Sequence, residues 1–598
     1  MSKLNETFNT LSNSGVVFPV VPDYILDNLA FELRPYQKEA ISRFLHYRSN
    51  IYAPRDNASN QIEKSRHLLW QMATGSGKTL IMAGLILELY KQGYRNFLFF
   101  VNSTNVLEKT YDNFTDITSQ KYQFADRIEI DGQNIKINIV DNFEGADNSS
   151  INIKFLTIQK LHIDLFNIRE NSIALDDLQD KKLVMLADEA HHLNSMTSRG
   201  EAEIETSWEN TVQNILKSNP DNLLLEFTAT IDWNNNEIAK KYSDKIIYNY
   251  DLRAFRTDGF SKDVFTFAVD NDVENRMLQA IIISHYRKRI AFDNGLFLKP
   301  VILFRSKTIN DSKADFEKFN SLISDLSDTQ IKTLFSNITT AGEDANIWIK
   351  AVNYFNSDIR GLVSELKQDF QEEFNLIVNS NQIESGIQST LNSLENHDNP
   401  VRAIFAVDML KEGWDVLNLF DIVRLYETRD GDWKNNGQTY VPGKTTISEQ
   451  QLIGRGARYF PFKYNASDKY KRKFDDNELE PLRIIEQMHY HCKNDPKYIT
   501  EIKSALIESG VMAGNDLVEY TLKMKEIFKT NSFQNKYVYE NELLSKKDLL
   551  TENMEIVESI LEEEKVILLP DYKSKTVDDY ITVNLATGQF SEEGVFNG

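Results

Sequence analysis

The sequence predicts an α/β protein built on two parallel sheets. Short apolar runs, rich in β-branched and aromatic residues, alternate with helical patterns along the chain. Runs this short and this continuously hydrophobic are typical of strands buried on both faces, as in parallel sheets. The 598 residues are enough for several domains of ~100–200 residues each. The expected strands are FLFFV (97–101), KFLTI (154–158), LVMLA (183–187), LLLEFTAT (223–230), VILF (301–304), RAIFAV (402–407) and IVRLYE (422–427).

A polar segment at 251–263, which contains Gly259, separates the two groups of expected strands. Such a segment favours a domain boundary. The long interval between VILF and RAIFAV, about 308–400, has helical patterns and is expected to be a helical insertion in the second domain. After about residue 500 the chain becomes helical and charged, then strand-like. We therefore expect an N-terminal leader (1–30), a first domain (31–258), a second domain (259–500) and a mixed C-terminal extension (501–598).

Composition and charge exclude several classes of protein. The sequence is 41% hydrophobic and 26% charged, and no run approaches the ~20 apolar residues that span a bilayer. The N-terminus MSKLNETFNT lacks the features of a secretory signal, and a single cysteine excludes disulfide frameworks and Cys-based zinc clusters. A cytoplasmic protein without a membrane partner is expected. The net charge of −22 argues against coating nucleic acid with the whole surface but allows a local groove.

The stretch QMATGSGKTLIMAGLILEL places glycines, a lysine and a threonine directly before an apolar helical run. Backbone N–H groups of such a turn converge on one point, where the positive end of the helix dipole also favours phosphate. Met72 occupies the first glycine position of the usual P-loop pattern, so a glycine-rich helix start that binds nothing is the alternative. The expected ATP-binding residues are Thr74, Gly75, Ser76, Gly77, Lys78 on the β- and γ-phosphates, and Thr79 on Mg²⁺.

Two acids follow the apolar run in LVMLADEAHHL. Asp188 and Glu189 are placed at the carboxyl end of an expected strand, where sites in parallel sheets open. One carboxylate can hold Mg²⁺ while its neighbour orients the attacking water. Alone, the pair could equally be a solvated acidic turn. His191 and His192 have no further ligand at metal-binding spacing, so coupling or packing is their expected role.

The order of these motifs resembles the superfamily 2 helicases of the DEAD/DEAH type over most of residues 31–460. The resemblance implies two RecA-like domains that bind ATP and Mg²⁺. Besides the P-loop and the acidic pair, it is carried by FELRPYQKEAI, VNSTNVLEKT, LTIQKL, EFTATI, VILFRSK, DMLKEGWDVLNLFDIVRL and QLIGRGARYF.

The resemblance also implies roles for individual residues. Those near the nucleotide are Gln37 on adenine, Gly413 and Asp415 in the interdomain region, and Gln451, Arg455 and Arg458 on the triphosphate. Those that couple the nucleotide to the bound strand are His191, Thr228, Ala229 and Thr230. Those expected to contact nucleic acid are Thr157, Gln159 and Arg305.

Arginine side chains at these two positions have a clear physical role. A second domain that delivers guanidinium groups to the γ-phosphate senses whether ATP is intact and stabilises charge during hydrolysis. Arg455 and Arg458 lie three residues apart, so on a helix they would share a face. With Glu189, they are the expected catalytic residues.

Within that superfamily, four motif sequences are most similar to those of the Res subunit of type III restriction–modification enzymes. They are MATGSGKT, LRAFRTDGFSK, LKEGWDVLN and QLIGRGARYFPF. This resemblance implies a DNA methyltransferase partner, Mod, and ATP hydrolysis that drives movement or switching on duplex DNA. The alternatives are a free-standing helicase on DNA or RNA, and a nucleotide-gated scaffold for a partner. The recognition site, the direction of movement and the assembly are not readable from the sequence.

Res subunits carry a nuclease domain after the motor, with Asp and then Glu-x-Lys held on strands. Here Glu563 and Lys565 fit that spacing, but they fall in a charged run that we expect to be helical and solvated. We expect either a chain that stops before the nuclease or a relative that lacks one. The expectation is a chain that hydrolyses ATP and leaves DNA intact.

Overall fold

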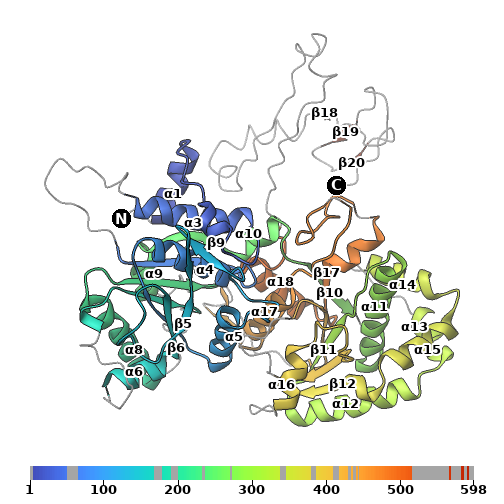
Figure 1. The fold of residues 1–598 in the computed structure, drawn as a ribbon. Coiled ribbons are helices and arrows are strands. Elements are labelled where there is room, and N and C mark those ends of the chain that lie inside the picture. Colours follow the sequence, from blue (N-terminus) through green and yellow to red (C-terminus); the bar gives the residue numbers. More distant parts are fainter. Residues whose placement is uncertain are drawn as a thin grey trace. The chain divides into compact units, whose positions relative to one another are not determined.

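Two parallel sheets organise residues 1–516, as the sequence predicts (Figure 1). The computed structural model forms two units, Met1–Asp516 and Leu517–Gly598. It describes residues 4–49, 65–166, 178–189, 199–231, 236–269, 272–336, 345–378, 385–407, 416–427, 432–434, 439–441, 444–465, 467–477, 479–514, 564–567, 581–584 and 589–590.

The first sheet has seven strands, all paired in parallel, in the order β5-β6-β2-β7-β8-β1-β9. Its strands are β1 (His67–Met72), β2 (Asn96–Val101), β5 (Ile137–Ile139), β6 (Ile151–Thr157), β7 (Leu183–Ala187), β8 (Leu223–Thr228) and β9 (Ile246–Tyr250). Its helices are α1 (Leu4–Asn13), α2 (Asp23–Leu26), α3 (Pro35–Arg48), α4 (Lys78–Lys91), α5 (Thr104–Thr115), α6 (Ile158–Phe166), α8 (Arg199–Ser218), α9 (Asn236–Tyr242) and α10 (Leu252–Thr257).

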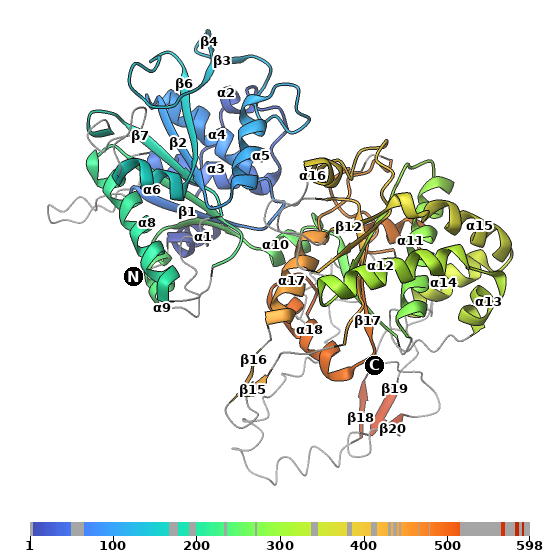
Figure 2. The ribbon, with the colours of Figure 1, turned by 90° about the horizontal axis from the view of Figure 1, so that it is seen from below.

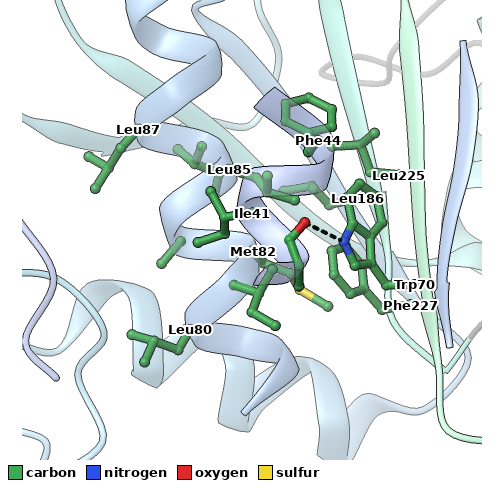
Figure 3. Close-up of a cluster of buried hydrophobic side chains, with 14 of the residues drawn as sticks. Ile41, Phe44, Trp70, Leu80, Met82, Leu85, Leu87, Leu186, Leu225 and Phe227 are labelled. Atoms are coloured by element: carbon green, nitrogen blue, oxygen red, sulfur yellow. Dashed lines mark hydrogen bonds between the residues drawn. The ribbon is translucent and has the colours of Figure 1, made fainter. Parts of the chain in front are cut away.

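Apolar side chains project from both faces of this sheet into hydrophobic cores. The sequences of its strands are therefore continuous apolar runs. In β2, Phe97 and Phe99 join the core under α3 and α4, whereas Leu98 and Phe100 join the core under α6 and α8. Figure 3 shows the first of these cores around Trp70, whose indole N–H donates to the Ala40 carbonyl at 3.4 Å. The two cores hold the sheet rigid beneath the P-loop.

The second sheet has six strands, again all parallel, in the order β10-β17-β14-β11-β13-β12. Figure 2 labels two of them, β12 and β17. Its strands are β10 (Asp263–Val269), β11 (Val301–Arg305), β12 (Asn375–Val378), β13 (Ala403–Ala406), β14 (Leu419–Arg424) and β17 (Gln487–Lys493). Its helices are α11 (Val273–Asp293), α12 (Ile309–Ser324), α13 (Asp328–Ser336), α14 (Ala345–Phe355), α15 (Ile359–Asp369), α16 (Ser385–Asn392), α17 (Lys444–Gly456) and α18 (Pro496–Glu508), with 3₁₀ turns at Glu372–Phe374 and Pro481–Glu486.

The insertion at 308–400 is mainly helical, with one correction. Its apolar stretch ends in β12, a strand that pairs in parallel with β13, rather than in helix. Leu376 and Ile377 there are matched to Ile404 and Phe405, so strand pairing outweighs the helical pattern that precedes it.

Two antiparallel strand pairs complete the unit Met1–Asp516. They are β3 (Ile128–Ile130) with β4 (Gln133–Ile135), and β15 (Asp432–Lys434) with β16 (Thr439–Val441).

The C-terminal unit contains a three-stranded antiparallel sheet of β18 (Glu564–Ile567), β19 (Ile581–Asn584) and β20 (Gln589–Phe590). This corrects the helical expectation for the end of the charged run, because Lys565 lies in β18 opposite Val583, whereas the run before Glu564 lies outside the described residues. Glu563 lies outside the described residues. Across the described ranges of both units, no helix is long and apolar enough to cross a membrane.

Candidate nucleotide-binding site

The predicted P-loop is the turn between β1 and α4. Gly75 and Gly77 have φ angles of 82° and 77°, in the left-handed region that favours glycine. Gly77 is the N-cap of α4, which begins at Lys78, so the first N–H groups of the helix open towards the turn. The sequence thus builds the anion-binding geometry that the motif predicts.

Helix α3 holds this turn from outside the sheet. The Gln37 side-chain amide donates to the Ser76 carbonyl at 2.8 Å, and the Tyr36 hydroxyl donates to the same oxygen at 2.9 Å. Gln37 also accepts from the Arg34 backbone N–H at 2.8 Å. A Cβ at Gly77 would overlap the Gln37 amide, so the second glycine is required by close approach as well as by φ. Gln37, predicted to contact adenine, therefore lies directly on the P-loop.

The acidic pair lies across the turn from the lysine. Lys78 is buried, and its ammonium group lies 3.4 Å from the Met72 carbonyl. Desolvation and the neighbouring Glu189 carboxylate raise the pKa of Asp188, whereas Lys78 lowers it. Glu189 has a φ of 52°, and its N–H donates to the Asp188 carboxylate at 3.0 Å. The left-handed backbone turns the second carboxylate away from the direction of β7.

A cleft of about 1110 Å³ collects these groups with residues of the second sheet domain. Arg458 packs on the P-loop, because a Cβ added at Gly75 would lie 3.2 Å from its Nε atom. The sequence-predicted residues that line this one cleft are Thr74, Gly75, Gly77, Lys78, Thr79, Asp188, Glu189, Ala229, Thr230, Gln451, Arg455 and Arg458. The structure therefore brings most of the predicted ATP site together.

The arginines share the cleft but not a helix, which corrects the sequence argument. Helix α17 ends at Gly456, so Arg455 is helical and Arg458 is not. Arg458 instead forms an isolated antiparallel bridge with Ser261. A Cβ at Gly456 would lie 3.1 Å from Leu419 and nearer still to Met488, so tight packing on the second sheet accompanies the end of the helix.

Helix α17 is fixed by a buried carboxylate. Glu449, fully buried, lies 3.1 Å from the Arg424 guanidinium and 3.7 Å from that of Arg305. The Tyr426 hydroxyl donates to Glu449 at 2.8 Å, and the Tyr498 hydroxyl of α18 donates to its other oxygen. One side chain thus ties α17 to two strands and a helix.

We expect Glu449→Gln to lower the thermal midpoint of the chain by on the order of 10 °C. Removing one partner of a buried ion pair costs about 3–5 kcal/mol, because two guanidinium groups lose their compensating charge. Differential scanning calorimetry measures this shift. Glu427→Gln is the matched control, since the Glu427 pair with Lys493 at 2.8 Å is about half exposed and should change the midpoint little. Equal midpoints for the two variants would contradict this role.

The three predicted nucleic-acid contacts do not share one environment. Thr157 is the last residue of β6, and Gln159 donates to the Asn102 side chain at 2.6 Å. These two residues therefore lie together at the carboxyl end of β6. Arg305 is buried at the end of β11, where it donates to the Ser448 hydroxyl at 2.9 Å and faces Glu449. In this structure Arg305 holds strand to helix and is not brought together with the other two.

Some predicted residues remain without a structural test. His191, Gly413 and Asp415 lie outside the described residues. Thr228 ends β8, and its hydroxyl donates to the Thr230 carbonyl at 2.9 Å. The cleft also has lining residues that the sequence did not single out: Gln71, Lys109, Asp251, Asn392, Glu395 and Gln450. Gln71 and Gln450 adjoin motif residues and Lys109 lies within VNSTNVLEKT, so these three had a signal in the sequence.

Comparison with known proteins identifies the family. A family model described as type III restriction enzyme, res subunit, matches residues 30–232. A protein of Haemophilus influenzae, named probable type III restriction-modification enzyme HindVIP Res subunit, is 38% identical over 458 residues, which are 70% of this chain and 88% of that protein. The chain belongs to the Res subunit family of type III restriction–modification enzymes.

The two regions matched by family models contain the two halves of the site. The Res model spans the P-loop and the acidic pair, and a second model, described as an N-terminal region, matches residues 445–515 and spans both arginines. Among solved structures, the type ISP restriction–modification enzyme LlaBIII bound to DNA has 12% identity and a TM-score of 0.39, over 81% of this chain and 33% of that one. Dbp5 of S. cerevisiae, bound to RNA and ADP BeF3, has 13% identity and a TM-score of 0.37, over 79% and 94%.

The Res family implies Mg²⁺ with the nucleotide, and the chemistry of the site fits that ion. Thr79 and Asp188 offer a hydroxyl and a carboxylate in the same cleft, the oxygen ligands that Mg²⁺ prefers. Within the described ranges, no group of three or more His, Cys, Asp or Glu side chains forms a closed cage.

Proposed function

We propose that this Res-family chain is an ATP-hydrolysing motor that acts on duplex DNA as part of a type III restriction–modification complex. One observation carries the proposal: a single cleft contains the P-loop and acidic pair of the first sheet domain and the arginines of the second. An ATPase that couples hydrolysis to domain movement needs catalytic groups from both sides of its nucleotide.

Each residue has a role in the proposed reaction. Lys78 and the P-loop N–H groups bind the phosphates, and Thr79 and Asp188 hold Mg²⁺, which would neutralise charge on the β- and γ-phosphates. Glu189 orients the attacking water. Arg455 and Arg458 stabilise charge that develops during transfer, so full catalysis requires the two domains to close on ATP.

A Mod methyltransferase subunit is the proposed partner, and the bacterial cytoplasm is the proposed location. The family and the curated relative, which is named as a Res subunit, support the partner. A free-standing helicase is the second candidate, because Thr157 and Gln159, both half-buried, lie at the carboxyl end of β6, where a single strand could bind.

The test is the steady-state ATPase rate of the full chain with no nucleic acid, single-stranded DNA, duplex DNA or RNA, each with and without Mod. We expect the largest stimulation with duplex DNA that carries the Mod recognition site, when Mod is present. Equal stimulation by RNA and single strands without Mod would favour the free-standing helicase. Glu189→Gln controls for contaminating ATPases, because that variant should stay inactive in every arm.

A further inference from the structure

Lys262 lies where the chain enters the second sheet domain, and it is completely buried. It directly precedes β10 and follows the segment around Gly259 that leads from the first sheet domain. No motif of the ATP site includes it, and it does not line the cleft. A lysine with no exposed surface needs a specific reason, because burial of an ammonium group is costly unless its donors are satisfied.

Three backbone carbonyls satisfy the Lys262 ammonium group. Its Nζ atom donates to Leu417 at 2.7 Å, to Leu419 at 2.7 Å and to Gly456 at 3.0 Å. The three acceptors match the three donors of a lysine. The Phe420 ring lies 4.3 Å from the same atom, which adds a cation–π contact. Lys262 therefore fastens the end of α17 to the start of β14.

The residues held at the end of α17 are those between the two arginines. Besides its side-chain bond to Gly456, Lys262 donates its backbone N–H to the Ala457 carbonyl at 2.6 Å. The preceding residue, Ser261, forms the bridge with Arg458. Gly456 and Ala457 are the only two residues between Arg455 and Arg458 in the chain. Lys262 thus contacts the backbone that sets where both guanidinium groups lie.

The segment before Lys262 is anchored in turn. The Arg472 guanidinium donates to the Ser261 carbonyl at 2.7 Å and to the Arg256 carbonyl at 3.0 Å, and the Arg472 N–H donates to Gly259 at 2.8 Å. The connection between the two sheet domains is therefore bonded to Arg472, and through Ser261 and Lys262 it is also bonded to residues 456–458. A shift of that connection would move the segment with it.

We propose that Lys262 is a positioning residue for Arg455 and Arg458, which it holds through Gly456 and Ala457 in the place required for ATP hydrolysis. The inference rests on the proposed function, because it assigns both arginines to that reaction. Lys262 reaches no substrate itself. Its removal misplaces the guanidinium groups without changing the P-loop, so it reduces turnover rather than ATP binding.

The test is a double-mutant cycle on the full chain, with Lys262→Met made in the wild type and in the Arg455→Ala/Arg458→Ala background. Methionine keeps an unbranched side chain of similar length and removes all three donors. We expect kcat to fall about 10- to 100-fold in the wild-type background, with the KM for ATP within about 2-fold. In the double-alanine background, single-turnover hydrolysis should fall by less than about 2-fold, because the groups that Lys262 positions are already absent.

Lys299→Met is the matched control. Lys299 is a half-buried lysine of the same domain that donates to the Asn399 carbonyl and does not contact α17. Its kcat should match the wild type. Thermal midpoints of both variants separate lost stability from lost positioning. If Lys262→Met does not melt cooperatively, Lys262→Arg replaces it in the same cycle, and its change in kcat must likewise vanish in the double-alanine background.

Two results would overturn the role of Lys262 but leave the proposed function intact, provided that the wild-type chain hydrolyses ATP. The first is a wild-type kcat in Lys262→Met. The second is a fall in the rate of ATP hydrolysis by the same factor in the wild-type and the double-alanine backgrounds. A wild-type chain that hydrolyses no ATP with any nucleic acid or with Mod would overturn the proposed function and the inference together.

Discussion

Glu189→Gln is expected to bind ATP with nearly wild-type affinity and to hydrolyse it about 10²–10⁴-fold more slowly, the usual contribution of a positioned acid–base group. Glutamine keeps the shape of the side chain, so the left-handed backbone at φ 52° should be retained. The phosphate-binding turn is untouched. The loss should therefore appear in the chemical step and not in ground-state binding.

Lys78→Ala is the contrasting variant, expected to fail at binding. It removes the buried cation of the P-loop, and a hydrogen bond to a charged group contributes about 1.5–3 kcal/mol, or roughly 10- to 150-fold in affinity. It also removes the charge that lowers the pKa of Asp188, so this carboxyl becomes harder to ionise for Mg²⁺. Weak nucleotide binding and undetectable turnover should occur together.

Calorimetric titration with a non-hydrolysable ATP analogue and single-turnover hydrolysis distinguish the two variants. Glu274→Gln serves as the control, because the half-exposed Glu274 side chain pairs with Lys318 at 3.0 Å and does not line the cleft. Unchanged turnover in Glu189→Gln would remove this residue from the site. Intact analogue binding in Lys78→Ala would mean that the turn between β1 and α4 is not where the phosphates bind.

Local patterns were enough to predict which residues of the first sheet domain come together in the candidate site. Apolar runs predicted the strands because both faces of each parallel sheet are covered, and LVMLA (183–187) matches β7 residue for residue. The role of Gly77 in the turn could be predicted because a glycine is favoured there, both by the turn and by its close approach to Gln37. The acidic pair followed from its place at the end of β7.

The second sheet was harder to read because polar residues occupy its interior. Strand β17, QMHYHCK, was not expected, since two of its seven residues are histidines. In the fold, the His491 ring N–H donates to the Asp421 carboxylate at 3.1 Å, and the Arg287 guanidinium lies 2.9 Å from the His489 ring. Burial and the positive charge of Arg287 lower the pKa of His489 to about 3, so this histidine is neutral. Partners that arrive from distant parts of the chain make such a strand possible, and no local pattern shows them.

The same limit explains Arg305 and the end of α17. Arg305 follows an apolar strand, a position that suggests an exposed contact, but its partner Glu449 is more than 140 residues away. The helical spacing of the two arginines suggested one continuous helix. Packing of Gly456 against the second sheet and the bond from Lys262 decide where that helix ends.

Arg455→Ala and Arg458→Ala are each expected to lower kcat by about 10³-fold or more, the scale of an arginine that stabilises phosphoryl transfer. Both line the cleft from the second sheet domain, whereas the phosphate-binding turn belongs to the first. Their contacts with the triphosphate should be complete only when the domains close, so affinity for ATP in the ground state should change much less than turnover.

Lysine substitutions refine this test, because lysine keeps the charge and loses the planar fork of donors. Arg458 also packs on Gly75, so Arg458→Lys should recover less activity than Arg455→Lys. Arg360→Ala is the control, since that side chain is 90% exposed and pairs with Asp328 away from the cleft. Equal losses of affinity and turnover in either alanine variant would indicate uniform binding of ground and transition states. The arginines would then anchor ATP to the second domain, and the stabilisation of charge during hydrolysis would have to come from Lys78 and Mg²⁺ alone.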